Sequence, residues 1–136
     1  PEEPSGCAAG HGQRTFEDCR QFLKKIKNGD IKAVTSNLVL AEINWTLLKF
    51  YKFTKEDAVK SLDSIARLSH LKFIDDFDSI LAVKFYKDYQ IKFIDALISS
   101  IPGISDGKVK IVSYDRDFDK LGDWRIEPKE VIKNKT

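Results

Sequence analysis

The sequence predicts an α/β domain in which a parallel sheet is flanked by helices. Short apolar runs at 31–35, 71–74 and 108–113 are typical of strands, and longer segments with helical spacing separate them. Strands that alternate with helices in this way favour parallel pairing with helices on both faces of the sheet. At 136 residues the chain is long enough to form one domain.

Periodicity and capping residues place the helices of the first half of the chain. Residues 16–28 carry an apolar side chain at every third or fourth position, which predicts an amphipathic helix. Ser36 is a candidate N-cap for a helix that continues to about residue 51. Thr54 followed by Asp57 resembles a capping box, which predicts a further helix to about residue 68.

The second half of the chain repeats the alternation on a shorter scale. Asp76 or Asp78 is expected to cap a helix that reaches about residue 89. A helix is expected over 93–101, because a Pro-Gly pair follows it. Residues 117–121 predict a helical turn, and 124–126 a last short strand.

The first 15 residues differ in composition from the rest of the chain. They contain no Lys, Ile, Val, Leu or aromatic residue, and three of the seven glycines. Such a segment buries too little apolar surface to offset the entropy lost on ordering. We therefore expect residues 1–15 to be a disordered or atypical tail and residues 16–136 to form the domain.

Composition limits the functions that the chain can have. The net charge is only +2, so any binding to nucleic acid must depend on a local patch of basic residues. No apolar run approaches the roughly 20 residues that span a membrane. Two cysteines are too few for a disulfide scaffold, which favours a cytoplasmic location.

Four carboxylates carry the chemical signal of the sequence: Glu42, Asp95, Asp115 and Asp117. Each lies within or beside an apolar segment, where an isolated charge is costly to bury. Taken singly they have ordinary explanations, since a solvated helix face accounts for Glu42 and helix capping for the aspartates. Taken together they fall near strand ends or helix starts, where α/β sheets bind ligands.

Carboxylates that converge at one edge of a sheet raise each other's pKa unless a cation compensates their charge. Mg²⁺ and Mn²⁺ accept oxygen ligands of this kind, and they lower the pKa of water so that it can attack a phosphodiester. The motifs of competing chemistries are absent: the chain has no Gly-rich phosphate loop, GxSxG, HExxH or CxxC. The sequence therefore predicts a metal-dependent hydrolytic site.

Three segments carry a resemblance to a known family: 35–43, with Glu42; 91–98, with Asp95; and 111–121, which reads Ile-Val-Ser-Tyr-Asp-Arg-Asp-Phe-Asp-Lys-Leu. In order and spacing they resemble the PIN-domain ribonucleases across roughly residues 16–132, and within that family the small prokaryotic type that includes VapC toxins. The third segment is similar to the family's strand followed by (Thr/Ser)-x-Asp-x-Asp-Phe, with Ser113 at the hydroxyl position.

The resemblance implies metal-dependent cleavage of RNA that is single-stranded or in exposed loops. It implies Glu42, Asp95 and Asp115 as ligands of Mg²⁺ or Mn²⁺. It also implies Asp117 as a supporting acid, and Ser113 as a group that orients water or a ligand. The expected partners are RNA, a small antitoxin protein and a second copy of the chain in a homodimer, with no membrane.

Basic and aromatic residues offer candidate contacts outside the acidic site. Three basic side chains are candidates for contacting RNA phosphates: Lys49, Lys52 and Arg116. Three aromatic residues at a helix end suit either core packing or a dimer or antitoxin interface: Phe50, Tyr51 and Phe53.

The chain departs from the family's pattern at its start. The family opens with a central strand that ends in Asp-(Thr/Ser)-Asn, whose aspartate is the first metal ligand, and residues 1–15 show neither. One hypothesis is that the start is truncated or misread. Without this strand we expect unpaired sheet edges and reduced nuclease activity. A non-catalytic PIN-like module that binds RNA or protein is the alternative to a nuclease.

Overall fold

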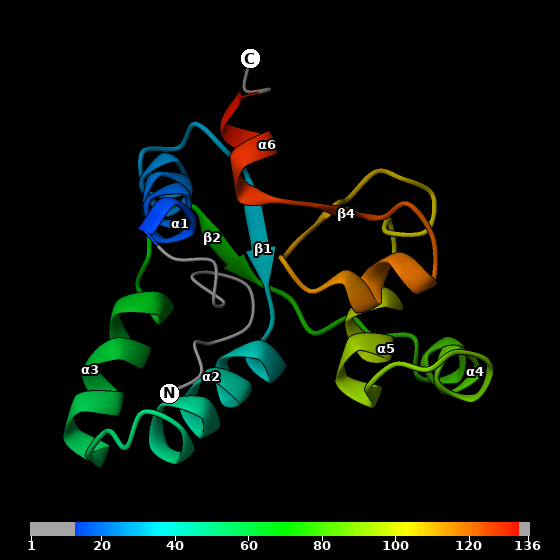
Figure 1. The fold of residues 1–136 in the computed structure, drawn as a ribbon, viewed down its shortest axis with the longest axis horizontal. Coiled ribbons are helices and arrows are strands. Elements are labelled where there is room, and N and C mark those ends of the chain that lie inside the picture. The colour runs from blue at the N-terminus through cyan, green and yellow to red at the C-terminus, as the bar shows by residue number, and fades with distance from the viewer. Residues whose placement is uncertain (1–12, 134–136) are drawn as a thin grey trace.

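Four short parallel strands form two separate sheets in the computed structural model, which describes residues 13–133 (Figure 1). In the first sheet β1 (Ala33–Thr35) pairs with β2 (Leu71–Phe73). In the second β3 (Ile111–Val112) pairs with β4 (Arg125–Ile126). The predicted parallel pairing is confirmed, although the strand expected over 108–113 is reduced to two residues.

Within residues 13–133 each sheet has only two strands, so β1 and β3 each keep one edge without a strand partner. Thr35 accepts from the amide of Ile74 at 2.8 Å, and the amide of Ile111 donates to Trp124 at 2.8 Å, so these groups point to the strand partner. Successive residues of a strand direct their backbone groups to opposite sides, so Val34 and Val112 direct theirs away from their partner strands. No backbone hydrogen bond joins the two sheets within residues 13–133. Within residues 13–133 no strand pairs with both β1 and β3.

The helices of the first half agree closely with the sequence. They are α1 (Gln13–Lys27), α2 (Asn37–Lys49) and α3 (Lys55–Ala66). The hydroxyl of Ser36 accepts from the amide of Val39 at 3.2 Å and confirms this N-cap. The hydroxyl of Thr54 likewise accepts from the amide of Asp57 at 3.1 Å. Helix α1 begins three residues earlier than expected, and residues 1–12, where most of the expected tail falls, lie outside the described part.

The helices of the second half are shorter. They are α4 (Ser79–Asp88), α5 (Phe93–Ser99), the 3₁₀ helix η1 (Arg116–Lys120) and α6 (Pro128–Lys133). Asp78, rather than Asp76, caps α4 by accepting from the amide of Leu81 at 3.0 Å. The sequence did not predict α6, although Pro128 at its first position and the bond from the amide of Glu127 to Glu130, at 2.8 Å, are typical of a helix start.

The buried core lies mainly in the second half. One cluster centres on Ala82, Ile91 and Ala96, between α4 and α5. The other centres on Ile104, Ile111 and Phe118, so that β3 and η1 share one apolar base. Helix α2, in contrast, has no fully buried residue. Helix α6 packs against α1 and so connects the end of the chain to its first helix (Figure 1).

The length and composition of the helices bear on the membrane prediction. Within the described residues, no helix combines the length and the apolar content needed to cross a bilayer.

The carboxylate of Asp75 ties the end of β2 to the start of α2, which generates a first prediction. It accepts from the amide of Asn37 at 2.9 Å and from the Asn37 side chain at 2.7 Å. We expect Asp75→Ala to lower the free energy of unfolding by about 1–2 kcal/mol, because it leaves a helix-terminal amide unpaired. Urea denaturation measures this, with Asp76→Ala as the neighbouring control. Equal effects of the two substitutions would contradict the prediction.

Candidate functional site

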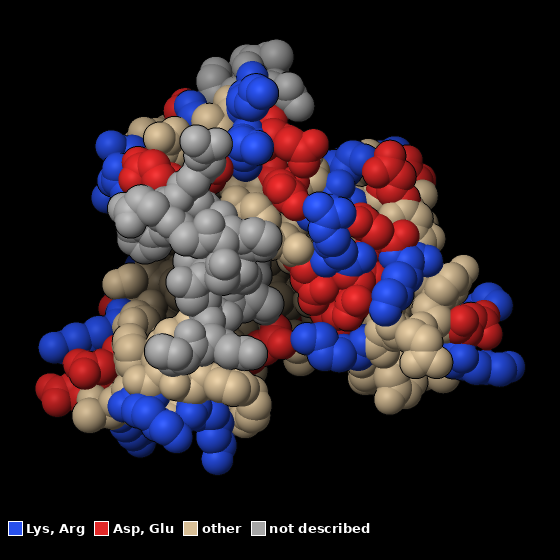
Figure 2. Space-filling view, viewed as in Figure 1, with Lys and Arg blue, Asp and Glu red and all other residues tan. Residues whose placement is uncertain are grey.

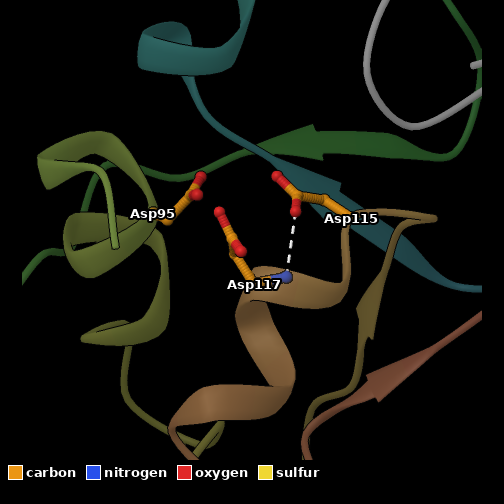
Figure 3. Close-up of side chains that lie close together, drawn as sticks. All are labelled: Asp95, Asp115 and Asp117. Carbon is orange, nitrogen blue, oxygen red and sulfur yellow. Dashed lines mark hydrogen bonds between the residues drawn. The ribbon is translucent and has the colours of Figure 1, made fainter. Parts of the chain in front are cut away.

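Three aspartates from two elements converge in the second half of the molecule. Asp95 lies in the first turn of α5, Asp115 precedes η1 as its N-cap, and Asp117 lies within η1. Carboxylate oxygens of the three lie within 4.8 Å of one another, and the side chains point toward a common centre (Figure 3). On the surface, acidic side chains over η1 and α5 are flanked by lysine and arginine side chains (Figure 2).

Asp95 is the buried member of the group. Only 6% of the residue is exposed, and its Oδ2 atom has no hydrogen-bond partner among the described residues. Burial raises the pKa of Asp95 from an ordinary value of 3.8 to about 6. Lys92 opposes this rise, whereas the carboxylates of Asp115, Glu42 and Asp117 add to it. A buried carboxylate without a donor is a position that a cation would stabilise.

Local hydrogen bonds fix the loop that carries the other two aspartates. The hydroxyl of Ser113 accepts from the amide of Asp115 at 3.0 Å. Oδ1 of Asp115 in turn accepts from the amide of Asp117 at 2.9 Å, which caps η1 (Figure 3). Phe118 anchors η1 in the apolar cluster beneath. Both aspartates are therefore held in place by the backbone and the core.

Arg125 closes this loop from the opposite side. The guanidinium donates to both carboxylate oxygens of Asp119, at 3.1 and 3.2 Å, and to Glu127 at 2.9 Å. It also donates to the backbone carbonyl of Ser113 at 2.9 Å. Only 10% of its side chain is exposed. Arg125 thus links the two ends of the segment that holds Asp115 and Asp117, a role that its position in the sequence did not reveal.

A lysine borders the acidic group. Lys120 pairs with Asp117 at 3.1 Å and donates to the carbonyl of Gln90 at 2.8 Å. It therefore joins η1 to the connection between α4 and α5. Sequence reasoning missed Lys120 because lysines on a helical turn are usually solvated, and only the fold brings it to Gln90.

The other residues expected at the site are distributed over a wider region. Ser113 is buried and its hydroxyl accepts from the amide of Asp115, and its role in orienting water or a ligand stays a prediction. Glu42 acts on Asp95 electrostatically, but its oxygens do not belong to the three-aspartate group. Arg116 is exposed at the start of η1. Lys49 is the last residue of α2 and Lys52 lies in the turn that follows, and both are exposed.

The residues of the three-aspartate group fit a hard divalent cation. All candidate ligand atoms are carboxylate oxygens, which Mg²⁺ and Mn²⁺ accept and which soft metals do not select. The unpartnered Oδ2 of Asp95 is the observation that favours a cation over a simple cluster of surface acids. Asp95, Asp115 and Asp117 are the residues that would hold it.

The fold and the site together define a mixed α/β domain with an acidic centre beyond the end of a parallel strand. The family model of the PIN domain matches residues 8–123, and the chain belongs to this family. PIN domains are commonly metal-dependent nucleases. No curated protein and no solved structure matches the chain. The match begins within the segment expected to be a tail, so the boundary at residue 16 stays a prediction.

The raised pKa of Asp95 predicts how stability depends on pH without metal. The folded state binds the proton of the Asp95 carboxyl group more tightly than the unfolded state does. The protonated carboxyl group therefore stabilises the fold fully below pH 3.8, and this stabilisation is lost as the pH rises to about 6. Asp95→Asn lacks this loss, because the amide stays neutral. In chelator above about pH 6 we expect Asp95→Asn to melt several degrees higher than the unmodified protein, with the gap closing at lower pH. Thermal unfolding checks this, and a gap that does not change with pH would contradict it.

The contacts of Arg125 predict an effect on cation affinity. Arg125→Lys keeps the charge, but an ammonium group cannot hold Asp119, Glu127 and Ser113 in the same fork. We expect Mn²⁺ to bind about tenfold more weakly, because the loop that presents Asp115 and Asp117 loses its support. Titration of the folded protein measures this, with the exposed Arg67→Lys, paired with Asp63 at 2.8 Å, as control. Unchanged Mn²⁺ affinity in Arg125→Lys would show that Arg125 only stabilises the fold.

Proposed function

We propose that this chain is a metal-dependent endoribonuclease that hydrolyses RNA phosphodiesters with Mg²⁺ or Mn²⁺. The observation that carries the proposal is the convergence of Asp95, Asp115 and Asp117, with one buried carboxylate oxygen left without a donor. Membership of the PIN family supports the same reaction class. The absence of other catalytic motifs in the sequence agrees with it.

Each acid has a distinct role in the proposed site. Asp95 supplies a buried carboxylate oxygen that water solvates poorly. Its negative charge is therefore stabilised more by a bound cation than by water. Asp115 has Oδ1 engaged by the amide of Asp117, which orients its other oxygen toward a ligand. Asp117 shares its charge with Lys120 and is the supporting acid. Glu42, on α2, adds negative charge and reaches the centre through water.

The chemistry divides between the cation and the chain. A divalent cation bound there supplies Lewis acidity and neutralises the charge that develops on the phosphate. The chain holds the carboxylates in a fixed geometry through Ser113 and Arg125. Arg116, exposed at the start of η1, is placed to contact a phosphate group of the substrate. Lys49 and Lys52 are further candidates for phosphate contact.

The proposal extends to a cytoplasmic toxin of a toxin–antitoxin pair, similar to VapC toxins. The three motifs around Glu42, Asp95 and Asp115 support it by their order and spacing. Exposed apolar side chains on α4 support a homodimer or an antitoxin interface, with Ile80 86%, Val83 54% and Tyr86 53% exposed. Large exposed apolar patches commonly mark protein interfaces.

A non-catalytic PIN module is the second candidate, and one observation favours it. The sheets are divided, and within residues 13–133 the acidic group has three aspartates and no fourth ligand from a central strand. Fewer carboxylates weaken Mg²⁺ binding, so low activity is expected even from a nuclease. Metal-dependent cleavage separates the two candidates.

Cleavage of single-stranded RNA tests the proposed function. We expect slow cleavage of a fluorescent RNA in Mn²⁺, none in chelator, and a loss of at least about a hundredfold in Asp95→Asn and Asp115→Asn. Asp76→Asn is the matched control, since Asp76 is exposed and lies outside the acidic group. No cleavage by folded protein that binds Mn²⁺ would support the non-catalytic module instead.

A further inference from the structure

Exposed aromatic and basic side chains gather where α2 meets α3. Trp45 is 53% exposed, Phe50 44% and Phe53 36%. The rings of Trp45 and Phe50 meet edge to face, with centroids 5.4 Å apart. Three exposed lysines accompany them, and we call the whole set the α2–α3 surface: Trp45, Lys49, Phe50, Lys52, Phe53 and Lys55.

The α2–α3 surface is positively charged. Residues 43–55 include three lysines and no acidic residue. Within the described chain, none of these lysines forms an ion pair with a carboxylate. Figure 2 shows basic side chains over the end of α2 beside uncharged surface. The first acidic residues after these lysines are Glu56 and Asp57, in the first turn of α3. This surface therefore attracts an anionic partner.

The backbone of Lys52 adds a second observation. Its φ angle is 56°, in the left-handed region that glycine and asparagine occupy at lower cost than lysine. The bond from the amide of Phe53 to the carbonyl of Leu47, at 3.0 Å, holds this turn. A strained, charged residue on a fixed turn between exposed rings is the kind of position that binding sites use.

Helix α2 leads from the acidic centre to this surface. Glu42, Trp45 and Lys49 are spaced by three and four residues, so they share one face of the helix. Glu42 acts electrostatically on Asp95 at one end of this face. The seven residues from Glu42 to Lys49 rise about 10 Å, at about 1.5 Å per residue. That length matches about three stacked nucleotides.

We propose that the α2–α3 surface binds single-stranded RNA on one side of the cleavage site. The exposed rings of Trp45, Phe50 and Phe53 stack on bases, and Lys49, Lys52 and Lys55 contact the phosphates. Stacking and charge together suit any sequence, since every base has a flat apolar face. This inference rests on the proposed function, because it names where that substrate lies.

The charge of the surface favours RNA over a protein partner. The exposed face of α4 also combines an aromatic ring, that of Tyr86, with lysines. There, however, Lys84 forms an ion pair with Asp88 at 3.1 Å, so part of the positive charge is neutralised. The α2–α3 surface has no such acidic residue between its lysines. Uncompensated lysines among rings match the phosphates and bases of a single strand.

Binding measured without cleavage tests the proposal. The probe is a fluorescein-labelled oligouridine of about 12 nucleotides, in chelator, with anisotropy recorded between about 50 and 200 mM salt. We expect Trp45→Leu to weaken binding about tenfold, and Trp45→Phe to retain most of the affinity. Lys49→Gln with Lys52→Gly is expected to lower the slope of log affinity against log salt by about 1.4. Glycine also relieves the strained turn, so a weaker complex in this variant is not the result of unfolding.

Matched variants on α4 are the control. Tyr89, at the end of α4, is 42% exposed, close to the 44% of Phe50, and Lys87 is exposed nearby, so Tyr89→Leu with Lys87→Gln should leave RNA affinity unchanged. The proposal is overturned if the unmodified protein does not bind the oligouridine. It is also overturned if the variants of the α2–α3 surface and the control variant on α4 bind the oligouridine equally well. It is also overturned if Trp45→Leu leaves RNA affinity unchanged but alters the mass of the protein particle in light scattering. That result would identify the surface as a protein interface.

The outcomes separate this proposal from the proposed function. Binding that depends on the α2–α3 surface, without metal-dependent cleavage, would support the surface and contradict the nuclease. Cleavage that is unaffected by Trp45→Leu and by the lysine variant would support the nuclease and overturn the surface.

Discussion

Repulsion among Asp95, Asp115 and Asp117 is the constraint on which the second half of the structure depends. Three carboxylates within 4.8 Å of one another, one of them buried, are unfavourable unless the surrounding structure holds them in place. The apolar clusters beneath α5 and η1 provide this support, because Phe118 fixes η1 and Ala96 fixes α5. The stability of the core thus maintains a local arrangement of charge that the isolated chain segments would avoid.

Arg125 extends this support across the molecule. Its hydrogen bonds connect η1, through Asp119, with the end of β3, through Ser113. They also reach Glu127, which precedes α6, and α6 packs against α1. One largely enclosed guanidinium therefore couples the loop of the acidic centre to the contact between the two ends of the described chain. Isolated surface ion pairs contribute little, but a nearly buried fork with several acceptors is held far more firmly.

Local sequence signals predicted the parts of the structure that depend on local contacts. The caps at Ser36, Thr54 and Asp78 and the strands near 33–35 and 71–73 follow from patterns within a few residues. The placement of Glu42, Asp95, Asp115 and Asp117 near strand ends and helix starts predicted one acidic group, and the structure brings the three aspartates together without Glu42. The roles of Arg125 and Lys120 depend on partners brought close by folding, which no local pattern encodes. Helix α6 was missed because its six residues are too few for periodicity to show.

The divided sheet has a consequence for how the protein behaves at high concentration. Val34 and Val112 direct their backbone donors and acceptors away from their partner strands, and no hydrogen bond joins the two sheets in the described chain. Open strand edges are templates on which an extended segment of another molecule can add as a strand. Self-association through strand addition is therefore the characteristic hazard of this architecture, and strands of two or three residues keep each template short.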